Sequence, residues 1–462
     1  RRRMNLRRSE IDLTQGSVWK QIARFAWPLL IGNIFQQMYN TVDSIVLGQY
    51  VNKEALAAVG SVGSSINAII GFFIGIATGA GVVIAQYCGA KDDRKLSDAV
   101  QTTMVVALAA CVICTFLGNL SVPLFLKIMK MEKTPEVYKM ADRYLRIYFW
   151  GVSGMLLYNV GAGILRAVGD SLRPLIFLII TTVINTVLDI LFVTKYNWEI
   201  EGVAYATVIA QFISAFMVLY VLTSSHMAYR VDWLRLRVDR SILAAIFKIG
   251  LPSAVQSFIT SFSNVFVQGY INVFGADCMA GWTAYGKIDQ FALLPISSIS
   301  LASTTFTGQN LGAGKRARAK EGLKVTMRMA AIVCVGLCIP MILFRRSLIS
   351  IFNTEEDVLY YGSIFLMMMS PFYIMCAINN IYAGVLRGAG CSLPPMIIML
   401  SSFVAFRQIY LYVFSHLTHS FYVVALAYPM GWILCSTLLL IYYYRGGWEK
   451  KSTILTQMKK EA

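Results

Sequence analysis

The segment Leu165-Arg166-Ala167-Val168-Gly169-Asp170-Ser171-Leu172-Arg173-Pro174 occurs a second time, with substitutions, as Leu386-Arg387-Gly388-Ala389-Gly390-Cys391-Ser392-Leu393-Pro394-Pro395. Two further pairs of segments keep the same order and nearly the same spacing: 27–29 with 251–253, and 86–90 with 309–313. Three landmarks repeated in one order predict two homologous halves of about 220 residues each. Duplicated hydrophobic halves are a recurring design of transporters, in which two similar halves rock about a central site.

The composition is typical of a membrane protein. Apolar residues make up 57% of the 462 residues, charged residues only 14%, and the mean hydropathy is +0.61. A soluble domain carries about 25% charged residues. Apolar runs of about 20 residues, long enough to cross a bilayer as a helix, recur along the chain. We therefore predict an all-α polytopic membrane protein with twelve transmembrane helices, at 20–48, 56–85, 96–126, 137–165, 174–195, 202–224, 243–273, 279–308, 322–345, 358–386, 395–416 and 421–444.

The excess of positive charge is explained by orientation in a membrane. The net charge is +17, and most of the 41 lysines and arginines fall on one side when the N-terminus is cytoplasmic. This positive-inside bias predicts a multi-pass protein of the cell membrane with both termini in the cytoplasm. No nucleic-acid partner is expected. The basic tail that starts with Arg1-Arg2-Arg3 is suited to contact anionic lipid.

The two halves divide the chain into two lobes. We predict an N-lobe at 1–224 with the basic tail and six helices, and a charged cytoplasmic connector at 225–242. A C-lobe with six helices follows at 243–445, and a cytoplasmic tail at 446–462. Because six helices return the chain to its starting side, the two bundles should be related by a pseudo-two-fold axis along the membrane normal. The expected assembly is a monomer.

Small residues and prolines occupy defined places in the helices. Gly71, Gly75 and Gly79 are spaced every four residues, and such a stripe lets two helix backbones approach closely. Pro28 and Pro252 fall early in the first span of each half. Each should kink its helix, because proline removes one backbone hydrogen bond.

No catalytic or metal-binding motif is recognisable. Cys111 and Cys114 have CxxC spacing, but apolar residues separate them and no histidine or carboxylate lies near. We interpret them as buried apolar residues rather than as a zinc or redox site. The three histidines lie at span ends or in loops, and no Ser-His-Asp order, HExxH or Walker A sequence occurs. The chain is therefore expected to be no enzyme and to carry no resident cofactor.

Two carboxylates stand within otherwise uncharged stretches. Asp43 is the only charged residue between Arg24 and Lys53, and Asp189 is the only one in its span before Lys195. A charge in the hydrocarbon costs about 3 kcal/mol on insertion scales, so it usually faces a cavity and has a partner. Asp189 lies about 9 Å along a helix from Lys195, and Asp43 lies at most about 15 Å from Lys53. Both are therefore placed in the outer half of the membrane.

Oxygen-bearing side chains accompany both aspartates. Asn185 lies one turn before Asp189 and Asn40 three residues before Asp43, so each shares a helix face with its carboxylate. Thr207 lies at a similar depth in the next span. This pattern predicts one of two sites. Either an oxygen cage for a small hard cation such as Na⁺ is formed by Asp43, Asn185, Asp189 and Thr207, or the two carboxylates form a proton-binding pair. Alternatively, the aspartates are separately satisfied and only hold helices together.

A second group of polar residues lies inside other spans. Lys287 and Asp289 are two residues apart in the eighth span and do not share a helix face. Arg407 stands alone about midway through the eleventh span and either pairs with Asp289 or faces a cavity. We assign Asn40, Tyr39, Arg407 and Asp289 to a candidate secondary polar cavity. The role of the Lys287 and Asp289 pair stays open.

Further segments complete a family pattern. The following segments occur together in this chain: Gln36-Gln37-Met38-Tyr39-Asn40-Thr41-Val42-Asp43, the paired Leu-Arg-x-x-Gly at 165–169 and 386–390, Asn185-x-x-x-Asp189 and Gly202-Val203-Ala204-Tyr205-Ala206-Thr207. Over about residues 14–445 this combination resembles the multidrug and toxic compound extrusion (MATE) family. The resemblance implies twelve helices in two bundles around a central cavity, and export driven by inward flow of Na⁺ or H⁺. It also implies an N-lobe cation site at Asp43, Asn185, Asp189 and Thr207.

The second half differs from the first at these positions. Some members of the family carry acidic residues in spans seven and ten, but the matching stretches 256–260 and 374–378 contain none. At the repeat offset the counterparts of three N-lobe residues are apolar or aromatic: Val267 for Asp43, Phe406 for Asn185 and Tyr410 for Asp189. We therefore expect the first lobe to sense the ion and the second mainly to shape the cavity.

The resulting hypothesis is a secondary active antiporter. Drug-like organic molecules, cationic or amphipathic, would enter from the cytoplasm or inner leaflet into a cavity lined by aromatic and methionine side chains, which suit flat apolar cations. Inward H⁺ or Na⁺ would bind at Asp43 and Asp189 and drive export. The expected partners are the small organic substrate and membrane lipid.

Two other functions are weighed against this hypothesis. A flippase for lipid-linked oligosaccharides, of the same superfamily, would need a cavity rich in arginine and lysine to hold pyrophosphate. Inside the spans we count only Lys287 and Arg407 as bases available to such a cavity. An intramembrane aspartyl enzyme could use Asp43 and Asp189 as a dyad, but the Gly-x-Gly-Asp signature of such enzymes is absent.

Overall fold

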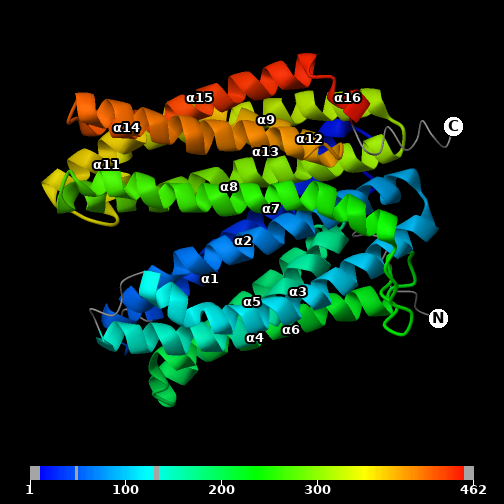
Figure 1. Cartoon of the computed structure of the whole chain (residues 1–462), viewed down its shortest axis with the longest axis horizontal. Coiled ribbons are helices and arrows are strands. Elements are labelled where there is room, and N and C mark those ends of the chain that lie inside the picture. The colour runs from blue at the N-terminus through cyan, green and yellow to red at the C-terminus, as the bar shows by residue number, and fades with distance from the viewer. Residues whose placement is uncertain (1–10, 47–49, 52, 129–134, 452–462) are drawn as a thin grey trace. The chain divides into compact units, whose positions relative to one another are not determined.

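The regular structure of the described residues is entirely helical. The computed structural model describes residues 11–46, 50–51, 53–128 and 135–451 (Figure 1). Arg1-Arg2-Arg3 and residues 452–462 of the expected cytoplasmic tails lie outside them. Eleven helical stretches in the described part are long and apolar enough to cross a membrane. The prediction of an all-α membrane protein is confirmed.

The helices coincide with the predicted spans to within a few residues. The first half contains α1 (Val18–Val46), α2 (Lys53–Ala90), α3 (Asp93–Ile128), α4 (Pro135–Ala167), α5 (Leu172–Ile190), its π-helical extension η4 (Leu191–Lys195) and α6 (Glu199–Ser224). The second half begins with α7 (Arg240–Asn272), α8 (Ala276–Gly312), α9 (Arg316–Leu343) and the short α10 (Arg345–Ser350).

Two spans of the second half are interrupted, which the apolar pattern did not predict. The tenth span consists of α11 (Glu356–Met369), a 3₁₀ turn η5 (Ser370–Phe372) and α12 (Tyr373–Gly388). The eleventh consists of α13 (Leu393–Leu400), a π-helical segment η6 (Ser401–Phe406) and α14 (Arg407–Leu417). The chain continues with α15 (Phe421–Arg445) and α16 (Trp448–Lys451).

Helix contacts group the chain into two compact units. Unit 1 contains Ile11 and residues 31–250, and unit 2 contains residues 12–30 and those from Leu251 onward. Two segments therefore differ from the lobes drawn from sequence: residues 12–30 pack with unit 2, whereas the connector and residues 243–250 pack with unit 1. Both breaks lie next to the predicted kink prolines, Pro28 and Pro252, although α1 and α7 each continue through their proline.

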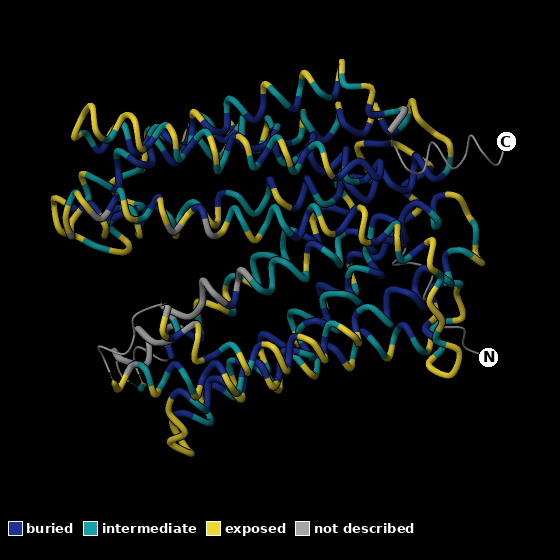
Figure 2. The backbone as a smooth tube through the Cα atoms, viewed as in Figure 1, coloured by how far each residue is buried: buried dark blue, intermediate teal, exposed yellow. Residues whose placement is uncertain are grey.

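Exposed positions recur along the helices of both units (Figure 2), and many of them are large apolar residues. In α3, for example, Leu117, Leu120 and Leu124 are exposed, whereas Val122 and Leu126 are fully buried. Exposure of such a surface to water would cost free energy. Exposure to hydrocarbon does not, because lipid tails are as apolar as leucine. The exposed apolar face of α3 is therefore suited to contact lipid.

The two copies of the repeated segment form the same helix end. At the end of α4, the Asp170 N–H donates to the Leu165 carbonyl at 2.8 Å and the Gly169 N–H to the Arg166 carbonyl at 3.0 Å. The second copy, residues 386–391, makes the same two bonds at 2.8 Å each. Both glycines have positive φ angles, +98° and +81°. These pairs of bonds satisfy carbonyls that a helix end leaves open, and they require the glycine conformation.

A second repeated pair, 86–90 with 309–313, ends α2 and α8 in the same way. In α8 the Lys315 N–H donates to the Asn310 carbonyl at 2.8 Å, and Gly314 has a φ of +73°. In α2 the corresponding bond is 3.3 Å long, and the left-handed residue is Lys91, with a φ of +55°. The left-handed region costs a residue with a side chain about 1–2 kcal/mol. Two of the three repeated pairs are therefore helix ends, and the third, 27–29 with 251–253, lies inside α1 and α7.

The glycine stripe of α2 permits a close helix contact within unit 1. A Cβ placed on Gly79 would lie 2.5 Å from the Gly250 Cα, and one placed on Gly250 would lie 2.9 Å from the Ile76 Cα. The Gly75 carbonyl oxygen lies at 3.3 Å from that second Cβ position. The predicted close approach is thus observed for Gly75 and Gly79, and the partner is the start of α7.

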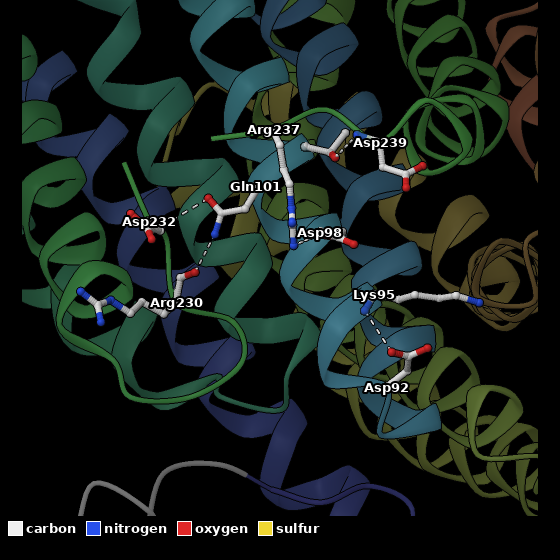
Figure 3. A network of polar contacts seen from close by, with 9 residues as sticks. Asp92, Lys95, Asp98, Gln101, Arg230, Asp232, Arg237 and Asp239 are labelled. Atoms are coloured by element: carbon white, nitrogen blue, oxygen red, sulfur yellow. Dashed lines mark hydrogen bonds and ion pairs between the residues drawn. The ribbon is translucent and has the colours of Figure 1, made fainter. Parts of the chain in front are cut away.

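The connector between the halves is bound to α3 (Figure 3). The Gln101 side-chain amide donates to the Arg230 carbonyl at 2.8 Å and accepts from the Asp232 N–H at 3.3 Å. Arg237 forms an ion pair with Asp98. The connector is therefore an ordered part of unit 1.

Replacement of Gly169 tests the repeated helix end. In Gly169→Ala the new methyl group would overlap the Ile11 carbonyl oxygen, in a backbone conformation that is strained for any side chain. We expect a loss of stability of about 2 kcal/mol. Lys91→Gly should instead gain about 1 kcal/mol, because glycine adopts the same angles without strain. Thermal unfolding in detergent measures both, and an unchanged midpoint for Gly169→Ala would contradict the expectation.

Candidate functional site

Helix α5 carries its polar side chains on the buried side. One face of α5 is apolar and exposed, and its residues are spaced three and four apart: Ile176, Ile180, Val183, Val187 and Ile190. The other face buries the polar residues Thr181, Thr182, Asn185 and Asp189. Lipid contact drives this arrangement, since polar side chains in a membrane helix turn toward protein.

The four residues predicted for the N-lobe site come together in unit 1. With its amide nitrogen facing the carboxylates, Asn185 donates to Asp43 Oδ1 at 2.9 Å and to Asp189 Oδ2 at 3.2 Å. The opposite amide orientation would place its oxygen against both carboxylates, which only accept hydrogen bonds. From α6, the Thr207 hydroxyl donates to Asp43 Oδ2 at 3.3 Å. One cluster thus joins α1, α5 and α6.

The cluster is buried and holds two acids without a basic partner. Asn185 and Asp189 have no exposed surface, and Asp43 and Thr207 are 9% and 3% exposed. Among the described residues, no lysine, arginine or histidine forms an ion pair with either carboxylate. Asp189 Oδ1 is buried and has no hydrogen-bond partner in the described part of the chain. Two buried carboxyl groups with neutral donors alone have the chemistry to take up a cation.

The donor atoms fit two kinds of cation differently. A proton can sit on either carboxyl group while Asn185 keeps donating to the other. Na⁺ prefers oxygen ligands, which the two carboxylates and Thr207 supply. Asn185 would have to turn its amide by half a rotation to offer oxygen as well. No group of three or more His, Cys, Asp or Glu residues that could hold a metal occurs among the residues described.

Aromatic hydroxyls surround the cluster, and sequence reasoning found only one of them. The Tyr39 hydroxyl is buried near Asp43 and Thr207. Tyr144 and Tyr148 of α4 also lie close to the carboxylates, with their rings stacked 6.1 Å apart. Their spacing of four residues was the available signal. Asn40, which was predicted to join a secondary cavity, is exposed on α1.

Asp289 and Arg407 lie in unit 2 and are not paired with each other. Asp289 Oδ1 accepts hydrogen bonds from the hydroxyls of Tyr285 at 2.9 Å and Tyr373 at 2.7 Å. The Arg407 guanidinium bonds to residues of α7 instead, so the expected ion pair with Asp289 is wrong. Two tyrosine hydroxyls supply the donors that the carboxylate needs. Lys287 is exposed.

The cysteines behave as predicted for apolar residues. All nine are free, and Cys111 and Cys114 are buried. The Cys111 thiol lies 3.7 Å from the Ser153 carbonyl oxygen, to which it donates. Within the described residues, the CxxC pair is therefore part of the helix packing of unit 1.

Comparison with known proteins gives a consistent result. A family model described as MatE matches residues 28–191 and 252–413, once in each half. The probable multidrug resistance protein YoeA of Bacillus subtilis is 30% identical over 446 residues, which cover 94% of this chain and 95% of that protein. The probable multidrug resistance protein NorM of Thermotoga maritima is 26% identical over 455 residues, 96% of each chain.

Solved structures share the fold. An outward-facing multidrug resistance MATE family transporter of the MOP superfamily superposes with a TM-score of 0.88 at 21% identity, over 97% of this chain and 99% of that one. A MOP superfamily transporter from Pyrococcus furiosus gives 0.89 at 22% identity, over 96% and 99%. Because the family model matches both halves and YoeA is 30% identical over 94% of the chain, the chain belongs to the MatE family of multidrug transporters, as its sequence motifs indicated.

The role of Asn185 in the cluster can be tested through stability. Asn185→Ala removes two hydrogen bonds to carboxylates, each with a net value of about 1.5–3 kcal/mol, and leaves both acids buried. We expect a loss of several kcal/mol. Asn159→Ala is the matched control, because in the described part of the chain Asn159 donates to a single acceptor, the Met155 carbonyl of its own helix. That change should cost about 1 kcal/mol. Equal losses in thermal unfolding would argue against a bridging role.

Proposed function

We propose that the protein is a secondary active antiporter that exports amphipathic, drug-like organic molecules in exchange for inward H⁺ or Na⁺. Asp43, Asn185, Asp189 and Thr207 form the proposed coupling site. The protein would lie in the cell membrane, with both termini in the cytoplasm. Membership of a multidrug transporter family supports the proposal, and so do the names of the relatives.

The observation that carries the proposal is the cluster around Asn185. One neutral amide donates to two buried carboxylates, and no base is paired with them among the described residues. Two such charges repel, and burial strengthens the repulsion because the local dielectric is low. Binding of a cation therefore lowers the electrostatic free energy of such a site, because it neutralises part of the buried negative charge.

Coupling would arise from the three helices that meet at the site. Asp43 belongs to α1, Asp189 to α5 and Thr207 to α6. Binding of a cation removes the repulsion between the two acids, so α1 and α5 can pack more closely. A cation shifts a conformational equilibrium only by its difference in affinity for the two states. The proposed transporter would therefore bind the ion most tightly in the state that has released its substrate.

We infer H⁺ as the coupling ion, with Na⁺ as the alternative. In the orientation that satisfies its hydrogen bonds, Asn185 presents nitrogen to both carboxylates. A proton can be added to this arrangement without movement of the amide, whereas full oxygen coordination of Na⁺ needs the amide to turn.

The other functions have less support. A lipid-linked oligosaccharide flippase would need several bases for its pyrophosphate, and among the described residues Arg407 is the only lysine or arginine that is buried. An intramembrane aspartyl enzyme would need water and substrate to reach both Asp43 and Asp189, but Asp189 has no exposed surface. A proteolysis assay with the purified protein tests this last reading directly.

Amide replacements of the two acids test the coupling site. Asp43→Asn and Asp189→Asn keep the size of each side chain but remove its proton-binding charge. We expect both variants to fold and to lose gradient-driven dye efflux from proteoliposomes almost completely. Asp142→Asn is the control, because Asp142 pairs with Arg146 at the surface of the same unit and should be dispensable. Efflux at the level of the parent protein in both variants would refute the proposal.

The coupling ion is tested by imposing the two gradients separately. In proteoliposomes without Na⁺, a proton gradient alone should drive dye export, and a Na⁺ gradient at equal pH should not. Collapse of the proton gradient with a protonophore should stop export. Export that follows the Na⁺ gradient and resists the protonophore would instead assign Na⁺ to the site.

A further inference from the structure

One exposed face of α9 changes from basic to apolar along its length. Lys324 and Arg328 are exposed in the first half of the helix. Three exposed apolar residues follow Arg328 at spacings of four, three and four: Ile332, Val335 and Ile339. Residues three and four apart lie on the same face of a helix. The two bases therefore continue the line of the three apolar side chains.

The apolar part of this face is suited to contact lipid tails. Ile332 is 65% exposed, Val335 58% and Ile339 55%, in a helix long and apolar enough to cross a membrane. Such a stripe is stable next to hydrocarbon, which is as apolar as the side chains themselves. Arg328 precedes Ile332 by one turn, about 6 Å along the axis. A long basic side chain at that distance extends to the headgroup layer of the leaflet.

The two bases have no acidic partner in the part of the chain that the structure describes. Neither Lys324 nor Arg328 forms an ion pair with a described residue. Lys320, one turn earlier, pairs with Glu449 at 2.7 Å. Glu321 lies three residues before Lys324 but forms no ion pair with it. Lys324 and Arg328 therefore keep their charged donors for an anion from outside.

The equivalent surface in the first half is covered by protein. The repeated pair 86–90 and 309–313 precedes α3 and α9 and sets an offset of 223 residues, so that Lys324 corresponds to Gln101. Gln101 is 3% exposed and binds the connector through the Arg230 carbonyl and the Asp232 N–H (Figure 3). Lys324 is exposed, so none of the described segments covers α9 in the way that the connector covers α3.

The segment that follows α15 has the wrong charge to cover these bases. By the same repeat, α15 corresponds to α6, which the connector follows. Residues 450–462 contain four lysines and a single glutamate, whereas Lys324 and Arg328 require an anion. Like charges repel one another. The cytoplasmic leaflet of a membrane supplies anionic headgroups at this depth.

We propose that Lys324 and Arg328 bind the phosphate of an anionic phospholipid in the cytoplasmic leaflet. The lipid would cover α9 at the position where the connector covers α3. Its acyl chains would lie along Ile332, Val335 and Ile339, and charge-assisted hydrogen bonds from the two bases would hold its headgroup. The site is separate from the coupling site and depends only on the proposed orientation of the chain in the membrane.

The test measures lipid binding to the full-length protein in a non-ionic detergent. Native mass spectrometry counts the bound phosphatidylglycerol molecules over a range of lipid concentrations, and phosphatidylcholine with the same acyl chains is the reference lipid. The double variant Lys324→Gln with Arg328→Gln should weaken the tightest phosphatidylglycerol site about 25-fold, since each base near an anionic headgroup contributes about fivefold in affinity. Binding of phosphatidylcholine should stay the same.

Matched variants separate this site from a general effect of charge. Arg230→Gln with Arg235→Gln removes two positive charges from exposed positions of the connector, and the tightest phosphatidylglycerol site should be unchanged. Glu321→Gln removes a negative charge beside Lys324 and should strengthen binding. Lys324→Arg with Arg328→Lys keeps both charges and should keep the preference for phosphatidylglycerol. Equal weakening in the two glutamine double variants would overturn the proposal.

The remaining measurements identify the bound group. Glycerophosphoglycerol, the water-soluble headgroup without acyl chains, should not displace the lipid even in large excess, because it lacks the contacts with the apolar face of α9. Displacement by this compound would assign the bases to soluble phosphate esters and overturn the lipid site. Asp189→Asn should bind phosphatidylglycerol like the parent protein, so that a failure of the antiport proposal and a failure of this one are observed separately.

Discussion

The structure of unit 1 depends on how two acids are kept inside a membrane helix bundle. Asp43 and Asp189 have no paired base among the described residues, and one amide, that of Asn185, donates to both. This constraint explains why α5 turns its polar side to protein and its isoleucines and valines outward. It also explains the contact of α6, whose Thr207 completes the donors to Asp43. Because only neutral groups donate to the two acids, one added positive charge strongly changes the electrostatic energy of the cluster.

The two halves show how a duplicated scaffold can carry different chemistry. Their helix ends are the same in detail, down to glycines with positive φ at 169 and 390. The buried polar groups are different. Val267, the counterpart of Asp43, is a fully buried core residue. Unit 2 instead buries Asp289 between tyrosines and Arg407 against Asn264. Helix ends are set by backbone hydrogen bonds, so they survive changes in the side chains of the interior.

Much of the fold and of the N-lobe site could be predicted from local patterns. Twelve apolar stretches indicated the helices, because only helices or closed barrels satisfy the backbone inside lipid. Depth along the helix and the spacing of Asn185 and Asp189 indicated four residues that the structure joins. Tyr144 and Tyr148 were missed, because their spacing of four residues indicates a shared helix face but not which neighbour that face meets. The breaks at η5 and η6 were missed because the apolar pattern continues through them.

The sequence by itself determined the membrane class, the approximate helix boundaries, the duplication and the family, since each can be recognised from patterns along the chain without knowing which side chains meet in space. Only the tertiary structure decided which polar groups meet. It paired Asp289 with Tyr373 rather than with Arg407, and Arg407 with Asn264. It also grouped residues 12–30 with the second half of the chain. Such partners lie over a hundred positions apart in several cases, and burial rather than sequence spacing selects them, because a buried polar group must find whatever donor or acceptor the packed helices bring near it.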